Sequence, residues 1–547
     1  MSRRAALARL HLTRHTVRVP ERLIVAPTDL RGVDPFVAQE ILKGRIPLAG
    51  RTLETEGKSP FSLELPSKPF AASLHSFRWL RHMRAEKSDR NCAAARAIVN
   101  DWIAVHGRRV EGVAWQADIT AQRLIAWLSH SPVVQQGTDS GFYRRFMRAI
   151  VFHIRYLRRI APTVPDGEMR LRVRIALAMA SVALPSRVSS IRSAGKALDR
   201  EIDRQILPDG AHISRSPRAA LNLLLDLLPL RQTYVNLGHD LPARLIPGID
   251  RMYPALRFFR HQDGDLALFN GATSTLANEL MSVLRYDETS GQPFKALPYA
   301  HYQRLSAGQA VLIVDTGAPA SADLSRRAHA GCLSFEMSAG RHRFIVNAGS
   351  PKFAGSDYVQ MARATAAHST VTLNDTSSMS FSRSDFIGPV MVGGVRNVEV
   401  ERTEREDGRD VVLARHDGYL AVFGLYHERE LTLNAGGTII TGRDRIFAPE
   451  GKSPAKGEHR ASARFHVHPS IALAQTENDS VLMTAPDGES WVFSSPGNEV
   501  LISEDIFFAD ASGVRASEQI EIAFSIAEKS EIRWFLSRRR QGGFSPR

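Results

Sequence analysis

The chain has 547 residues, of which 43% are hydrophobic and 23% are charged. This composition is typical of globular proteins, and the length excludes a single small domain. The 71 basic residues outnumber the 57 acidic ones, which gives a net charge of +14. Most of the basic residues are arginines, and a guanidinium group binds carboxylate, sulfate and phosphate in a bidentate manner. We therefore expect a polyanion as the partner.

The first twenty residues, MSRRAALARLHLTRHTVRVP, begin with the arginines of a signal sequence but lack its uninterrupted apolar core. The pattern therefore predicts no signal peptide. No apolar run reaches the roughly 18 residues that span a bilayer, so we expect no transmembrane segment. Cys92 and Cys332 lie far apart in the sequence and in different predicted domains, which excludes a disulfide framework.

Residues 66–290 carry a helical pattern, and residues 1–65 precede it as an N-terminal arm. Apolar residues recur at spacings of three and four, as in the stripe Leu74, Phe77, Leu80 and Met83. A serine followed by a proline at 216–217 is typical of a helix N-terminus. Further helices are predicted over Arg244–Phe259 and Thr273–Leu284. We expect roughly eight to ten helices with short connections, stacked as an array or a ring of antiparallel neighbours.

After about residue 292 the apolar period changes from that of a helix to that of a strand. We expect a boundary within Asp287–Ala300 and an all-β sandwich domain over residues 300–538. The predicted strands include Ala310–Val314, Cys332–Met337, Arg343–Val346, Ser369–Leu373, Val411–Ala414, Leu420–Leu425, Glu430–Leu433 and Ile520–Ile526. The last residues, SRRRQGGFSPR, are expected to form a solvated basic tail.

His329, Asn347 and His368 stand at the ends of successive predicted strands. Such strand ends can bring ligands or catalytic groups together at one point of a sheet. The simpler interpretation is that both histidines are hydrogen-bonded turn residues. No sequence-local metal motif such as His-Glu-x-x-His is present, so the spacing alone does not decide between the two.

The segments RAHAGCLSF (327–335), VNAG (346–349) and RATAAHSTV (363–371) resemble the heparinase II/III-like polysaccharide lyases. The β-domain of that family carries patterns close to His-x-His-Ala-Asp-x-x-Ser-Phe, Val-Asp-x-Gly and Arg-Ser-Thr-x-Ala-His-Asn-Thr-Val. The segments PDGAHISRSP (208–217) and DGDLALFN (263–270) extend the resemblance into the helical half. The resemblance implies an N-terminal α/α toroid followed by a C-terminal antiparallel β-sandwich.

The resemblance also implies β-elimination at C4 of a uronic acid in an anionic polysaccharide, with no required cofactor. Such a lyase must neutralise the C6 carboxylate, remove the C5 proton and protonate the departing O4. The family uses an Asn or His for the first task and a Tyr and a His for the other two. It often holds a structural zinc by two His and an Asp, whose positions correspond here to His329, His368 and Asn347. A neutral asparagine is a poor zinc ligand.

All three chemical positions of the family are substituted in this chain. Arg327 stands where the family has its catalytic histidine. Residues 167–169, Gly-Glu-Met, align with the Gly-Asn-His stretch, and residues 216–220 align with the stretch that supplies the tyrosine. The chemistry is therefore either rebuilt from other residues or lost.

A rebuilt site is predicted from the remaining polar residues. Arg327 would act on the substrate carboxylate as a catalytic residue, and Arg215 and Arg363 would bind the substrate. His212 has the pKa range of a general base, although a turn hydrogen bond is an alternative role for it.

Weaker candidates complete this predicted site. Tyr253 and His261 are candidates for the general acid, although a half-buried helix position is the simpler interpretation of Tyr253. Trp115 and Arg123 could form a sugar-binding platform, but tryptophan at helical spacing more often belongs to the core.

Two functions remain open at this point. The first is a carbon–oxygen lyase acting on a uronate-containing, glycosaminoglycan-like polysaccharide, and the second is a non-catalytic envelope protein that binds glycans with the lyase fold. No nucleic-acid recognition motif is present, so we expect no nucleic-acid partner. The resemblance implies the cell envelope or periplasm, with the cytoplasm as the alternative since no signal peptide is recognised. The oligomeric state is left open.

Overall fold

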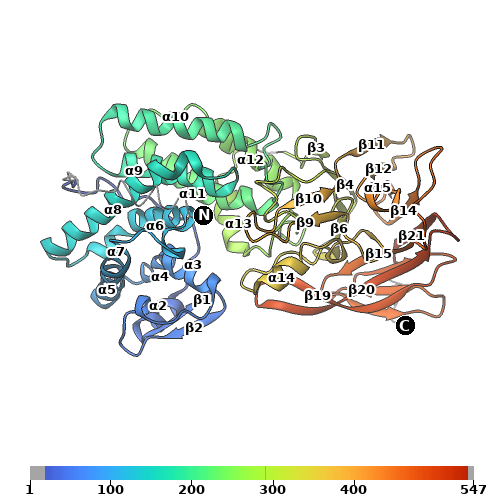
Figure 1. Ribbon diagram of the computed structural model, residues 1–547, viewed down its shortest axis with the longest axis horizontal. Coiled ribbons are helices and arrows are strands. Elements are labelled where there is room, and N and C mark those ends of the chain that lie inside the picture. Colours follow the sequence, from blue (N-terminus) through green and yellow to red (C-terminus); the bar gives the residue numbers. More distant parts are fainter. Residues whose placement is uncertain (1–18, 290, 540–547) are drawn as a thin grey trace, which may run out of the picture. The chain divides into compact units, whose positions relative to one another are not determined.

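The computed structural model describes residues 19–289 and 291–539 (Figure 1). The signal-like first residues up to 18 and most of the predicted basic tail lie outside the described residues. Contacts divide the chain into two compact units, which are described separately. Unit 1 comprises Met1–Ile206, Leu221–Met252 and Asn278–Glu288, and unit 2 comprises Leu207–Ala220, Tyr253–Ala277 and Thr289–Arg547.

The predicted order of a helical region followed by antiparallel sheets is confirmed. The two-unit division differs from the predicted ranges at two segments. Leu207–Ala220 and Tyr253–Ala277 lie inside the range predicted for the helical domain, whereas their contacts group them with the β-rich unit. Both segments carry candidate site residues, which therefore belong to unit 2.

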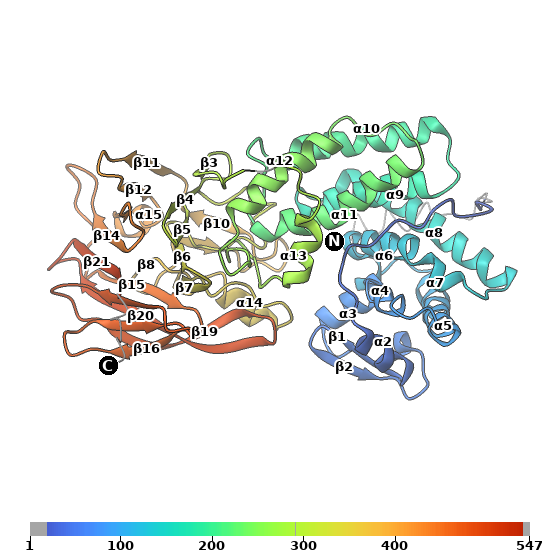
Figure 2. The same cartoon turned by 180° about the vertical axis from the view of Figure 1, so that it is seen from behind.

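The described residues of unit 1 are helical apart from one short hairpin, and Figure 2 shows the helices from behind. The hairpin pairs β1 (Arg45–Leu48) with β2 (Arg51–Glu54). The α-helices are α2 (Pro35–Leu42), α3 (Lys68–Ser76), α4 (Leu80–Met83), α5 (Asp89–His106), α6 (Ala117–Ser129), α7 (Ser131–Gln135), α8 (Ser140–Ile160), α9 (Glu168–Ala183), α10 (Val188–Gln205), α11 (Pro217–Asn236), α12 (Leu245–Phe258) and α13 (Ala277–Leu284). The 3-10 helices are η1 (Pro60–Ser62), η2 (Val113–Trp115) and η3 (Ala161–Thr163).

The predicted stripe from Leu74 to Met83 is divided between two helices. Phe77 ends α3 with a left-handed backbone (φ 57°), and α4 begins at Leu80. All four apolar side chains of the stripe are still buried. The apolar spacing therefore predicted burial correctly but could not reveal the break, because the chain turns within one helical period.

Helix α8 is the longest helix among the described residues, and its sequence explains both of its faces. The carboxylate of Asp139 caps its N-terminus by accepting from the backbone N–H groups of Gly141 and Phe142 (2.6 and 2.8 Å). Apolar side chains at a spacing of three and four face the interior, whereas every arginine of the helix is exposed.

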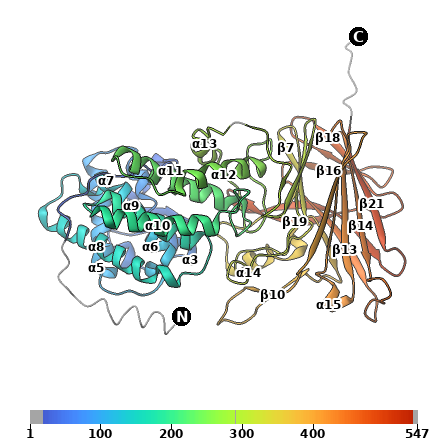
Figure 3. The same cartoon turned by 90° about the horizontal axis from the view of Figure 1, so that it is seen from above.

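Unit 2 is a sandwich of two antiparallel sheets, whose strands are seen from above in Figure 3. One sheet has eight strands in the order β11-β12-β13-β14-β21-β18-β17-β16, and the other runs β19-β20-β15-β7-β6-β5-β4-β3, with β8 paired to β15. The strands are β3 (Ala296–Leu297), β4 (Tyr302–Ala307), β5 (Ala310–Asp315), β6 (Phe335–Ala339), β7 (His342–Val346), β8 (Val371–Leu373), β9 (Met379–Phe381), β10 (Met391–Gly394), β11 (Val398–Glu404), β12 (Asp410–His416), β13 (Tyr426–Leu433), β14 (Ile439–Phe447), β15 (Arg460–Val467), β16 (Ala472–Gln475), β17 (Val481–Thr484), β18 (Ser490–Ser494), β19 (Leu501–Asp510), β20 (Gly513–Ser525) and β21 (Glu531–Arg538). Short helices α14 (Ser356–Met361), η4 (Thr365–Ala367) and α15 (Leu420–Phe423) lie between them.

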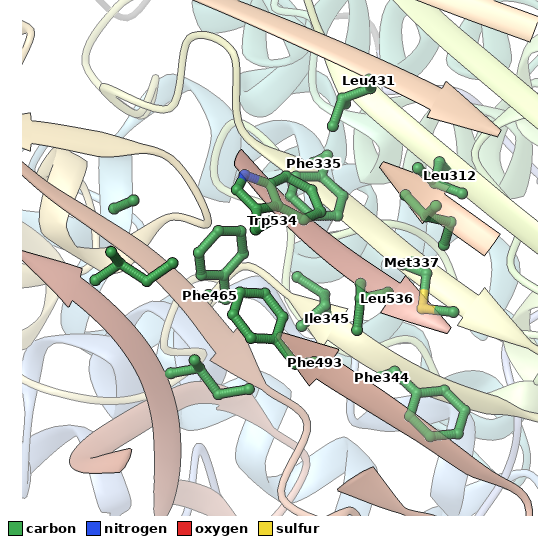
Figure 4. Packing of buried hydrophobic residues seen from close by; sticks show 14 of the residues in the cluster. Leu312, Phe335, Met337, Phe344, Ile345, Leu431, Phe465, Phe493, Trp534 and Leu536 are labelled. Atoms are coloured by element: carbon green, nitrogen blue, oxygen red, sulfur yellow. The ribbon is translucent and has the colours of Figure 1, made fainter. Parts of the chain in front are cut away.

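Aromatic side chains from both sheets fill the core of the sandwich (Figure 4). Phe335 of β6 stacks on Trp534 of β21 with ring centroids 5.4 Å apart, and Phe465 and Phe493 pack beside them. Gly442 makes room for this arrangement, because a Cβ atom there would lie 2.0 Å from the Trp534 ring. Alternating burial along β13 and β14 agrees with the strand period in the sequence.

One predicted strand is wrong. Residues 420–425 were expected to be extended, but Leu420–Phe423 form the short helix α15, which ends at Gly424 in a left-handed conformation. An unbroken apolar run does not distinguish a buried strand from a buried helical turn. The preceding residue, Tyr419, anchors this turn through its hydroxyl, which donates to the Val371 carbonyl (2.8 Å).

No helix among the described residues is long and apolar enough to cross a bilayer. Both cysteines are buried free thiols, Cys92 in unit 1 and Cys332 in unit 2.

Candidate functional site

Arg215 is enclosed within unit 2 and is not available to a substrate. Its backbone is left-handed (φ 61°), and the side chain is 6% exposed. The guanidinium pairs with Asp315 and donates to the carbonyls of Ala300 (2.9 Å), Gly317 (3.2 Å) and Ala318 (2.9 Å). The predicted substrate-binding role stays a prediction, and the use of these donors inside the unit argues against it.

Asn270 connects Arg215 to His329, although no role was predicted for this asparagine. Its amide donates to the Tyr302 hydroxyl (2.7 Å) and to Asp315 (3.3 Å), and its carbonyl accepts from the backbone N–H of His329 (3.3 Å). The Tyr302 hydroxyl in turn donates to the Arg215 carbonyl (2.8 Å), and burial raises the pKa of this tyrosine. These contacts hold three motif segments together without exposing an acid or a base.

Glu336 is a second buried centre that the sequence reasoning missed. Its carboxylate is 0% exposed, lies 3.0 Å from Nε2 of His261, and accepts from the backbone N–H groups of Leu268 (3.1 Å) and Asn347 (3.0 Å). The other ring nitrogen of His261 lies 2.9 Å from the Ser338 hydroxyl. Both nitrogens of His261 are therefore engaged, which argues against its predicted role as a general acid. An acidic residue inside the apolar run Phe335-Glu336-Met337 was the available signal, since a buried glutamate is almost always paired.

His329 and His368 contact each other directly. Nδ1 of His329 lies 3.1 Å from Nε2 of His368, and Nδ1 of His368 lies 2.7 Å from the Ala364 carbonyl. Burial lowers the pKa of both rings, that of His368 to about 3. At neutral pH both are therefore uncharged, and both ring nitrogens of His368 are engaged in these two contacts.

The predicted zinc site does not fit this arrangement. Asn347 is 0% exposed, and its amide bonds Glu336 (3.4 Å) while its carbonyl accepts from the Ser369 N–H (3.1 Å). Both polar atoms of its side chain are engaged in these contacts, and an amide lacks the charge that zinc prefers. Across the described residues, no group of three His, Cys, Asp or Glu side chains is arranged to hold a metal ion.

The two arginines of the motif differ sharply. Arg363 is 1% exposed and donates to the carbonyls of Ala328 (2.9 Å), Pro389 (2.8 Å) and Ser325 (2.7 Å), which argues against its predicted substrate-binding role. Burial lowers its pKa to about 10, which leaves it charged at neutral pH. Arg327 is exposed, and its guanidinium forms no hydrogen bond with the described part of the chain.

His212 and Tyr253 are both 1% exposed. Nδ1 of His212 accepts from the backbone N–H of Ser214 (3.1 Å) and lies 2.8 Å from its hydroxyl. This is the turn hydrogen bond that the sequence offered as the alternative role. A general base such as the one predicted at His212 must reach the proton that it removes, and a general acid such as the one predicted at Tyr253 must reach the group that it protonates. At 1% exposure both rings are shielded from solvent.

Trp115 and Arg123 belong to the interior of unit 1, which argues against the predicted sugar platform. Arg123 is 0% exposed, lies 4.0 Å above the Trp102 ring and donates to Nε2 of His153 (2.7 Å) and the His75 carbonyl (2.8 Å). Burial lowers the pKa of Arg123 well below its usual range. Trp115 is 3% exposed and packs in the same aromatic cluster, as expected for tryptophan at helical spacing.

Comparisons with known proteins agree with this fold. The family described as "Heparinase II/III-like, C-terminal" matches residues 289–535. FtsZ-localized protein C of Caulobacter vibrioides is 31% identical over 538 residues, which cover 95% of this chain and 91% of that protein. The chain belongs to the heparinase II/III-like family.

Solved structures of heparinase II/III-like lyases share the fold over nearly the whole chain. Heparinase III superimposes with a TM-score of 0.74 at 13% identity, over 98% of this chain and 89% of that one. A mutant of the heparan sulfate lyase HepC from Pedobacter heparinus gives 0.62 at 14% identity, over 94% and 85%. At such identities the likeness is one of fold, and the chemistry has to be argued from the residues.

Proposed function

We propose that this chain is a non-catalytic heparinase II/III-like protein that binds an anionic, uronate-containing polysaccharide without cleaving it. The observation that carries the proposal is the inward bonding of the candidate chemical groups. His261 is held by Glu336 and Ser338, and Arg363 by three carbonyls. The substitution of the family's own catalytic positions supports the same conclusion.

β-Elimination requires groups that touch the sugar. A base must lie within hydrogen-bond reach of the C5 proton, and a cation or amide must face the C6 carboxylate. Among the residues predicted for these tasks, only Arg327 is exposed. An exposed arginine can bind a carboxylate, but it stays protonated and cannot remove a proton at neutral pH.

Retention of the fold favours a carbohydrate ligand. The match to heparinase III extends over 98% of the chain, and the net charge of +14 suits a polyanion. Binding without turnover is therefore the function that we infer, with the lyase reaction as the alternative.

A paired assay tests the proposal. Polygalacturonate, alginate, hyaluronan and heparan sulfate are incubated with the full chain, and the ultraviolet absorbance of an unsaturated product is followed beside a calorimetric binding measurement. We expect binding to at least one polymer with a flat absorbance trace, while a known lyase on the same polymer gives a rising trace. Product formation by the wild type that is abolished in His212→Ala and Arg327→Ala would establish the lyase instead.

We further propose that the chain localises with FtsZ, because its 31% identical relative is described as FtsZ-localized. A protein that localises with FtsZ must share its compartment, so this proposal competes with the periplasmic location expected from the family. A fluorescent fusion imaged beside labelled FtsZ is expected to show overlapping signals at the division site. A diffuse or peripheral signal, or activity of a reporter that works only in the periplasm, would contradict it.

A further inference from the structure

Helix α8 of unit 1 is labelled in Figures 1 and 2. The sequence of this helix carries several exposed arginines that belong to no candidate site. Its 21 residues contain six arginines and no acidic residue. We define the arginine ridge as Arg144, Arg148, Arg155 and Arg158, all of them exposed. A fifth, Arg145, donates to the Asn100 side chain (3.2 and 3.3 Å) and lies off the ridge.

The ridge is a narrow, straight array. At 3.6 residues per turn, its four positions fall within an arc of about 80° on the helix surface. At a rise of 1.5 Å per residue they extend over about 21 Å. The capped N-terminus and the buried opposite face hold the array in place, so it is present before any ligand arrives.

The stability of unit 1 does not account for the ridge. Arg144 and Arg148 are a like-charged pair four residues apart, and Arg155 and Arg158 are three apart, so both pairs repel. The helix dipole stabilises Arg158 in the last turn of α8, but it gives no such support to Arg144, Arg148 or Arg155. Within the described residues, no ion pair joins the four ridge guanidinium groups to a carboxylate.

The opposite face of α8 narrows the choice of partner. Its apolar side chains, including Phe146, Ile150 and Leu157, are buried in the unit at 0% exposure. The helix therefore offers charge without an apolar face that could insert into a lipid layer. Guanidinium groups in a row match a row of carboxylates on an extended chain, and no nucleic-acid-binding motif accompanies them.

We propose that the arginine ridge is a docking surface for an extended carboxylated polysaccharide. This inference rests on the proposed binding function and adds the place on the molecule where the polymer lies. The ridge is separate in sequence from every residue predicted for the catalytic site. The interaction is electrostatic, so it weakens as the screening length falls to about 3 Å at roughly 1 M salt.

The test compares two variants of the full chain that lose the same charge. The ridge variant carries Arg144→Gln, Arg148→Gln, Arg155→Gln and Arg158→Gln. The control variant carries Arg200→Gln, Arg383→Gln, Arg405→Gln and Arg460→Gln, four exposed and scattered positions. Affinity for polygalacturonate is measured by calorimetry, with dextran as a neutral polymer. Because each exposed ion pair contributes a factor of about 2, the ridge variant should bind roughly 10- to 20-fold more weakly, and the control about 2-fold or less.

Each outcome decides between the two proposals. Equal losses in both variants, or full affinity in the ridge variant, overturn the ridge and leave the binding function standing. If the wild type binds none of the carboxylated polymers, both proposals fail. Ridge-dependent binding that is tighter for poly-glutamate, duplex DNA or anionic vesicles overturns the polysaccharide assignment and names the class that replaces it. Cleavage of the polymer overturns only the claim of a non-catalytic protein.

Discussion

The arginines of the unit 2 motifs and those of helix α8 in unit 1 are the same side chain in opposite settings. Arg215, Arg363 and Arg429 are at most 6% exposed and donate to carbonyls and carboxylates of their own unit. The arginines of the ridge are exposed and form no ion pair with a carboxylate in the part of the chain that the structure describes. The arginines of this chain therefore form two groups. Buried arginines stabilise the fold, whereas the exposed arginines of the ridge are available to a partner.

The largest effect is expected from the buried pair of Arg429 and Asp444. The Asp444 carboxylate accepts from Arg429 Nε and Nη2 (2.7 and 3.0 Å) and from Trp534 Nε1 (2.9 Å), and lies 2.8 Å from Nε2 of His427. Replacing Asp444→Asn leaves the arginine charge buried without its counter-ion, which should lower the free energy of unfolding by about 3–5 kcal/mol. Urea unfolding followed by circular dichroism measures it.

The matched control is Glu430→Gln on the neighbouring β13. Glu430 pairs with Arg443 at the surface, with 30% of its side chain exposed. It should change the free energy of unfolding by about 0.5 kcal/mol or less. A comparable fall in the free energy of unfolding in the two variants would contradict the distinction between buried and exposed arginine pairs.

A smaller loss is expected when the family's aspartate is restored. Asn347→Asp removes a donor to Glu336 and places a second carboxylate against it at 0% exposure. The free energy of unfolding should fall by about 2–4 kcal/mol, and zinc should not recover it. Melting temperatures with zinc and with a chelator check this, beside the same exchange at the exposed Asn478. A zinc-dependent rise in the variant would mean that the histidine pair is ready for a metal.

Acid should weaken both units through histidines that are buried uncharged. Burial lowers the pKa of His75 in unit 1 and of His368 in unit 2 to about 3. The unfolded chain takes up these protons near pH 6.5, so the free energy of unfolding should fall as pH drops from about 6.5 towards 3. Each histidine contributes about 1.4 kcal/mol per pH unit. In His368→Gln the slope of stability against pH should be shallower by that amount, and an unchanged slope would show that this ring is protonated in the fold.

The smallest effect is expected from the ridge itself. Neutralising Arg144, Arg148, Arg155 and Arg158 removes like-charge repulsion and breaks no buried contact. The free energy of unfolding should therefore change by about 0.5 kcal/mol or less, or rise slightly. If the free energy of unfolding falls by several kcal/mol in the same urea assay, these arginines stabilise the fold as the buried ones do.

The period of apolar residues was sufficient to predict the order of helices and sheets, because burial of one face imposes that period on the sequence. It failed at Leu420–Phe423, where the run lacks a polar residue to reveal its period. The proximity of His329 to His368 followed from motif order. The inward bonding of Arg215 and Arg363 could not be predicted, because most of their acceptors are backbone carbonyls far away in the sequence. The Ala318 carbonyl is 103 positions from Arg215, and the Ser325 carbonyl is 38 positions from Arg363. Every residue type has a backbone carbonyl, so the sequence alone does not indicate which residues accept these hydrogen bonds.

The pairing of Arg215 with Asp315 has a consequence for how the chain is made. The two residues are 100 positions apart, and the arginine leaves the ribosome first. At roughly 5–20 residues per second, its counter-ion follows about 5–20 s later. The guanidinium of Arg215 therefore stays hydrated, and the segment Leu207–Ala220 cannot take its final place, until the first strands of the sandwich have been synthesised. Helices of unit 1 that precede and follow this segment in the sequence can form in the meantime. The ion pair between Arg215 and Asp315 is therefore expected to form late during synthesis.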